Sequence, residues 1–111
     1  MRLMDPEITV AHVGESMTVV AVHGELDLHA ADELRRALGA DGRRLIVDLV
    51  GTTFVDSTAL GIIAAAARGA DVSVVVSDPR IARIFQLTGL DRSVTVEGSL
   101  AEAIAHRFLP A

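Results

Sequence analysis

The chain has 111 residues and a net charge of −5, and its length predicts a single domain (residues 1–111). Because 50% of the residues are hydrophobic but only 3% are aromatic, we expect an aliphatic core, and because there is no cysteine we expect neither disulfides nor thiolate metal sites. Its ten basic residues are scattered arginines, and without a basic stripe nucleic acid is not an expected partner. The sequence has neither a signal-peptide core nor an apolar run of the roughly 18 residues that span a bilayer, so we expect a cytoplasmic protein without membrane contact.

The first half of the chain predicts a hairpin, a helix and a buried strand. Two β-rich runs, residues 7–12 and 17–23, are separated by a short glycine-containing turn and indicate an antiparallel hairpin. Residues 24–27 (GELD) end the second strand, and residues 30–38 place apolar and charged side chains on opposite faces of a helix. Residues 45–49 (LIVDL) have the apolar pattern of a strand that is buried on both faces.

A turn is predicted between that buried strand and the second helix. Residues 51–53 break the strand pattern, residues 54 and 55 anchor the turn, and the pair Asp56-Ser57 leads into an alanine-rich helix over residues 57–67. This helix is apolar nearly all round, which is typical of a deeply buried helix.

The second half alternates strands and helices. Residues 72–76 predict a buried strand, Pro79 opens a third helix, and residues 93–96 form a last short strand. Ser99 and Glu102 have the spacing of a capping box that starts a terminal helix. The order β-β-α-β-α-β-α-β-α predicts an α/β fold: a mostly parallel sheet with an antiparallel edge strand and helices packed on it.

The polar residues at the start of the second helix are the candidate site. Backbone N–H groups point outward where a buried strand leads into a helix, and ligands and modifications tend to act there. Ser57 can be interpreted as a helix N-cap or as a modified residue, and the two interpretations are compatible. Thr58 is either a solvent-facing first-turn residue or an alternative acceptor. Asp27 either initiates the first helix or belongs to an interface.

Ile62 can belong to the core or to an exposed apolar patch beside Ser57. We expect the patch, because a two-layer domain rarely covers a helix on both sides. We expect no catalytic residues, cofactor or metal, because neither a G-x-S-x-G elbow nor a Walker-type phosphate loop is present. The histidines lack metal-ligand spacing with one another; they are His12, His23, His29 and His106.

Three segments resemble the anti-sigma factor antagonist family, the bacterial regulators built on the STAS domain. They are residues 24–27 (GELD), 54–61 (FVDSTALG) and 84–90 (IFQLTGL), which occur in order and at compatible distances. The likeness covers nearly the whole chain and implies the α/β STAS fold.

The resemblance also implies a phosphorylation switch that regulates sigma-factor-dependent transcription. In that family the serine after the aspartate is phosphorylated by an anti-sigma factor that is also a serine kinase. The unmodified antagonist binds this partner and frees the sigma factor, and a phosphatase resets the switch. Ser57 matches the phosphoacceptor, with Thr58 as the alternative, and Asp56 and Asp27 match its acidic neighbours. Together with Ile62, these residues form the expected partner-binding surface.

This chain departs from the family pattern in two places. Ala59 stands where the family usually has glycine, which places a methyl group close to the site. The second helix is about one to two turns shorter than is usual, which reduces the surface next to Ser57. These departures keep a second hypothesis open, a non-catalytic STAS scaffold or sensor subunit of a larger complex in which Ser57 is only a helix cap.

Overall fold

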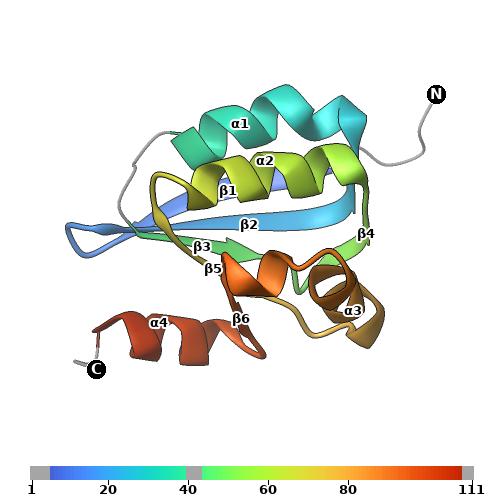
Figure 1. The fold of residues 1–111 in the computed structure, drawn as a ribbon. Helices are drawn as coiled ribbons and strands as arrows, with labels where there is room; N and C mark the ends of the chain where they lie inside the picture. Colours follow the sequence, from blue (N-terminus) through green and yellow to red (C-terminus); the bar gives the residue numbers. More distant parts are fainter. Residues whose placement is uncertain (1–5, 40–43, 109–111) are drawn as a thin grey trace.

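A computed structural model of the chain describes residues 6–39 and 44–108, and it shows a mixed sheet with helices on both faces (Figure 1). The main sheet has the strand order β1-β2-β3-β5-β6. Its strands are β1 (Glu7–Val13), β2 (Met17–Leu26), β3 (Arg44–Asp48), β5 (Asp71–Val75) and β6 (Thr95–Glu97). The edge strand β1 is antiparallel to β2, and the other pairs are parallel. The predicted fold class is therefore confirmed.

The helices form the outer layers. They are α1 (Ala31–Gly39), α2 (Ser57–Ala67), α3 (Pro79–Leu87) and α4 (Leu100–Phe108), with short 3₁₀ turns η1 (Leu28–Ala30) and η2 (Leu90–Arg92). Helices α1 and α2 lie side by side over one face of the sheet, and α4 lies on the opposite face (Figure 1). No helix in the described residues is long and apolar enough to cross a membrane.

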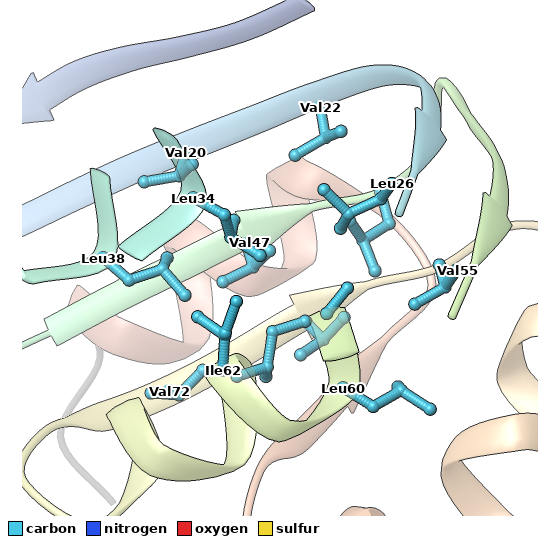
Figure 2. Close-up of a cluster of buried hydrophobic side chains, with 14 of the residues drawn as sticks. Val20, Val22, Leu26, Leu34, Leu38, Val47, Val55, Leu60, Ile62 and Val72 are labelled. Carbon is cyan, nitrogen blue, oxygen red and sulfur yellow. The ribbon is translucent and has the colours of Figure 1, made fainter. Parts of the chain in front are cut away.

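The core is divided by the sheet into two clusters. In β3, Leu45 and Val47 face α1 and α2, whereas Ile46 faces α4, because successive side chains of a strand point to opposite faces. Figure 2 shows part of the larger cluster. The labelled side chains are Val20, Val22, Leu26, Leu34, Leu38, Val47, Val55, Leu60, Ile62 and Val72. Strand β3 is thus buried on both faces, as its apolar pattern predicts.

The predicted turn over residues 51–55 is wrong. Thr52–Val55 forms a further strand, β4, which runs parallel to the end of β2. Strand β2 pairs with β3 as far as Ala21 and then, from Gly24 onward, with β4. The register shifts after Gly24, whose φ of 95° suits a residue without Cβ at a bulge. Four β-prone residues are too few to give a periodic signal, and the pairing that stabilises them is remote in sequence.

Smaller differences concern the ends of elements. The 3₁₀ turn η2 occupies residues 90–92, so the last strand begins at Thr95 rather than at residue 93. The serine half of the predicted capping box is present, because the Glu102 N–H donates to Ser99 Oγ at 3.1 Å. Helices α2 and α3 occupy the predicted residues.

Candidate functional site

The candidate site lies where β2 and β4 end and α2 begins. Because these two strands are parallel, their carboxyl ends meet at the same side of the molecule. The backbone N–H of Asp56 donates to the carbonyl of Leu26 at 3.1 Å, which ties the start of α2 to the end of β2. Turn η1 follows β2 directly and lies against α2. Residues 26–30 and 56–60 therefore lie next to each other in the fold.

Asp56 connects the two segments through its side chain. Oδ1 accepts a hydrogen bond from the backbone N–H of Ala59 at 2.9 Å, and Oδ2 accepts one from the backbone N–H of Leu28 at 2.9 Å. The first bond has the geometry of an N-cap, and the extended backbone of Asp56 (φ −99°, ψ 176°) agrees with it. One carboxylate therefore caps α2 and fastens η1 to it.

The interpretation of Ser57 as the helix cap is wrong. Ser57 is the first residue within α2, its side chain is exposed, and the cap is Asp56. Aspartate and serine cap helices about equally well, so the sequence DS does not distinguish the two positions. Only the aspartate has two acceptor oxygens, one for the helix and one for Leu28. The hydroxyl of Ser57 is therefore not needed to begin the helix.

Ser57 and Thr58 lie at one end of a groove between α1 and α2. The groove has a volume of about 540 Å³. Its lining is mostly apolar or small, and it comprises Arg35, Leu38 and Gly39 from α1 and Ser57, Thr58, Gly61, Ile62, Ala65 and Ala66 from α2. A Cβ atom added to Gly61 would meet no other atom within 4 Å, so the groove is open at this point. Ser57 is exposed, whereas Thr58 is only half-exposed.

The expectation that Ile62 belongs to an exposed patch is wrong. Its side chain is 8% exposed and belongs to the larger core cluster, although part of it lines the groove (Figure 2). Helix α1 packs beside α2, so α2 is covered by the sheet on one side and by α1 on another. The sequence pattern of a single helix does not show which of its faces a neighbouring helix will cover.

Two exposed apolar residues are connected to Asp56, Leu28 through a hydrogen bond and Phe54 through the chain, and the sequence analysis predicted neither as a site residue. Leu28 is 64% exposed and Phe54 is 50% exposed. Leu28 donates its backbone N–H to Asp56, and Phe54 precedes Asp56 by two residues in β4. One feature of the sequence could have indicated each residue. Leu28 is an isolated apolar residue between Asp27 and His29, and Phe54 is one of three aromatic residues in the chain.

Asp27 initiates turn η1, the segment that leads into the first helix. Its side chain accepts a hydrogen bond from the backbone N–H of His29 at 3.0 Å, and the His29 imidazole lies 3.5 Å from the same carboxylate oxygen. Asp27 therefore caps the 3₁₀ turn that precedes the first helix, and α1 itself begins at Ala31. Because Leu28 follows Asp27 and is bonded to Asp56, both carboxylates belong to the same surface.

Ala59 does not add a methyl group to that surface. The residue is 1% exposed and its side chain belongs to the core beneath α2. The replacement of the usual glycine is therefore accommodated inside the molecule. No group of three or more potential ligands in the described residues is placed to hold a metal ion.

This fold and site define a small α/β domain in which a capped helix presents two hydroxyls at the end of an apolar groove. The chain belongs to the STAS domain family, because the model of that family matches residues 8–103. The resemblance found in the three sequence segments is thereby confirmed.

Solved structures of anti-sigma factor antagonists have the same fold. An anti-sigma factor antagonist from Mycobacterium paratuberculosis is 29% identical, with a TM-score of 0.82 over 92% of this chain and 93% of that chain. The anti-sigma factor antagonist SpoIIAA in its unphosphorylated form is 20% identical, with a TM-score of 0.71 over 91% of this chain and 96% of that chain. The Bacillus cell fate determinant SpoIIAA in its phosphorylated form is 23% identical, with a TM-score of 0.70 over 91% and 99% of the two chains.

Proposed function

We propose that this protein is an anti-sigma factor antagonist that binds its partner when Ser57 is unmodified and releases it when Ser57 is phosphorylated. The observation that carries the proposal is that two different residues fill the two roles at the start of α2: Asp56 is the helix cap, and Ser57 is exposed. A kinase can therefore modify Ser57 without removing the hydrogen bond that starts the helix. The similarity to an antagonist at 29% identity supports the general role.

The proposed partner is an anti-sigma factor with serine kinase activity, and a phosphatase resets the switch. SpoIIAA has been described in both an unphosphorylated and a phosphorylated form, which supports a modification of this kind in the fold. Regulation of a sigma factor places the protein in the cytoplasm and requires no catalysis by the chain itself. Ser57 is favoured over Thr58 as the acceptor because Thr58 is partly covered in the groove.

The proposed contact surface combines polar and apolar residues around the start of α2. Asp27, Asp56, Ser57 and Thr58 supply its polar part, and the exposed side chains of Leu28 and Phe54 supply apolar area. Ile62 contributes to the floor of the adjoining groove rather than to an exposed patch. Apolar side chains that become fully desolvated at the centre of an interface carry much of its binding energy.

Phosphorylation would oppose binding through charge. A phosphate adds about −1.5 to −2 charges near pH 7, and the carboxylate of Asp56 is adjacent while that of Asp27 lies on the same surface. The positive end of the α2 dipole tolerates a phosphate at the first helical residue, so the fold is retained. Burying these neighbouring negative charges at an interface costs desolvation energy, which weakens binding of the partner without a change of fold.

The scaffold hypothesis is less well supported. It gives Ser57 a purely structural role as the helix cap, and Asp56 occupies that role. A serine that is not required for the fold and is exposed beside apolar side chains favours regulated binding.

Intact-mass analysis tests the proposal directly. The protein is incubated with ATP and a kinase-type anti-sigma factor from the same organism, and we expect the gain of one phosphate. Ser57→Ala should abolish the gain, whereas Ser77→Ala, which alters an exposed serine next to the N-cap of α3, should not. Residual phosphate that maps to Thr58 would identify the other hydroxyl as the acceptor. No phosphate on the wild-type protein, together with binding that does not respond to ATP, would favour the scaffold.

A further inference from the structure

Arg35 is the single basic side chain that lines the groove, as far as the described residues extend. Its guanidinium Nη1 lies 3.0 Å from Asp32 Oδ1, three residues earlier on α1, and both side chains are exposed. An exposed ion pair of this kind contributes little to stability and exchanges easily with solvent or with another anion. Arg35 is therefore held loosely, on the opposite wall of the groove from Ser57.

The direction of α1 brings Arg35 toward the end of the groove where Ser57 lies. Helices α1 and α2 lie side by side and run in the same direction, so their N-termini are at the same end (Figure 1). Side chains in a helix lean toward its N-terminus. The contact between Arg35 and Asp32 shows that Arg35 leans in this way. Its guanidinium therefore extends toward the hydroxyl end of the groove rather than toward Ala65 and Ala66.

We propose that Arg35 is the cation that binds the phosphate on Ser57, exchanging Asp32 for the phosphate oxygens. This inference rests on the proposed function, namely that Ser57 is the phosphoacceptor. A phosphate carries up to two charges and three acceptor oxygens, and a guanidinium can donate to two of them at once. The phosphate is thus a stronger partner for Arg35 than a single exposed carboxylate.

This contact would join the two walls of the groove. Arg35 belongs to α1 and Ser57 to α2, so a phosphate between them bridges the helices across the open space beside Gly61. In the modified protein the groove is then crossed by a charged pair and is no longer available to an apolar side chain of the partner. Phosphorylation would act by occupying the groove as well as by adding charge.

The test installs phosphoserine at position 57 during translation, so that it requires no kinase. Phosphorus NMR then measures the second pKa of the phosphate in the parent phosphoprotein and in its Arg35→Gln and Arg36→Gln variants. Arg36 is the matched control, because it is exposed on the same helix, carries the same charge and does not line the groove. A nearby cation lowers the pKa of an anion, so Arg35→Gln should raise the phosphate pKa by about one unit. Arg36→Gln should raise it much less.

Equal changes in the two glutamine variants would overturn the assignment of Arg35. Arg35→Lys keeps the charge, so the phosphate pKa in this variant should stay close to that of the parent phosphoprotein. If Arg35 acted only through the shape of the groove, the lysine variant should change the phosphate pKa as much as the glutamine variant does. Thermal melting of each variant verifies the fold. The proposed function is judged separately, by titrating the anti-sigma factor with the parent phosphoprotein. If that titration shows unchanged affinity, the switch fails, while the NMR measurement still decides whether Arg35 binds the phosphate.

Discussion

The Oδ2 atom of Asp56 accepts a hydrogen bond from the backbone N–H of Leu28 at 2.9 Å, across 28 residues of sequence. Its Oδ1 atom is bonded to the backbone N–H of Ala59 at the same distance. The carboxylate of Asp56 therefore adds a side-chain link between the start of α2 and turn η1 to the backbone hydrogen bond from Asp56 to Leu26. This arrangement also explains why an aspartate, rather than a shorter capping residue, precedes Ser57.

Replacing Asp56 by alanine should destabilise the protein by about 2 kcal/mol, because a helix cap contributes about 1 kcal/mol and a hydrogen bond to a charged group a similar amount or more. Asp56→Ser should recover part of the loss, since serine can cap α2 but cannot also reach Leu28. Urea unfolding measures both values. Asp32→Ala, which removes an exposed ion pair and a first-turn carboxylate of α1, should cost less than about 1 kcal/mol. Equal stabilities of the Asp56 and Asp32 variants would mean that the two hydrogen bonds of Asp56 contribute nothing to the free energy of unfolding.

Truncating Ile62 to alanine should reduce the free energy of unfolding by about 2–5 kcal/mol, the usual cost of an isoleucine removed from a packed core. The reason is that Ile62 belongs to the buried cluster beneath α2. Differential scanning calorimetry provides the measurement, and Ala65→Ser, an exposed change on the same helix, is the control. A variant that melts like the wild-type protein would show that Ile62 is not packed as described.

Leu28→Ser and Phe54→Ser should each weaken binding of the proposed anti-sigma partner by about tenfold, which corresponds to about 1.4 kcal/mol. Both side chains are exposed, so thermal stability should change little. Leu87→Ser is a suitable control, because Leu87 is an equally large exposed apolar residue at the end of α3. Calorimetric titration of the partner with each variant measures the three affinities. Loss of affinity in the Leu87 variant alone would place the partner on a different face.

Ser57→Asp should keep the fold, because an acidic side chain in the first turn of a helix interacts favourably with the helix dipole. It should nevertheless weaken partner binding, although less than authentic phosphorylation, since a carboxylate carries less charge and fewer acceptor oxygens. Titrating the partner with wild type, Ser57→Asp and phosphorylated protein should give affinities that fall in this order. Ser57→Asn, which has the same shape without the charge, should bind more tightly than Ser57→Asp. Three equal affinities for wild type, Ser57→Asp and phosphoprotein would support the constitutive scaffold.

Local patterns were sufficient to predict most of the fold. Helices α2 and α3 occupy the predicted residues, and β3 is buried on both faces as its run of apolar residues indicated. Strand β4 was missed because it is short and because its stability comes from pairing with residues 24–26 of β2. A pattern read within one segment does not contain that pairing.

The site could be predicted in its location but not in its internal roles. The residues Asp56 and Ser57 mark it in the sequence, and the three-segment resemblance identified the family. Which of the two caps the helix depends on the position of Leu28, which belongs to another segment. The burial of Ile62 depends on α1, and the exposure of Phe54 depends on the strand that was not foreseen. Each of these properties is set by tertiary neighbours.

The bond between Asp56 and Leu28 has a further consequence for how Ser57 is recognised. A peptide that covers only residues 50–67 lacks turn η1 and therefore lacks half of the surface that surrounds the serine. An enzyme that recognises this surface would act on the native domain and would ignore the same residues in an unfolded or partly degraded chain. Phosphate on Ser57 would then be present only on folded protein. Unfolded or degraded copies would not be phosphorylated and would not consume ATP in this reaction.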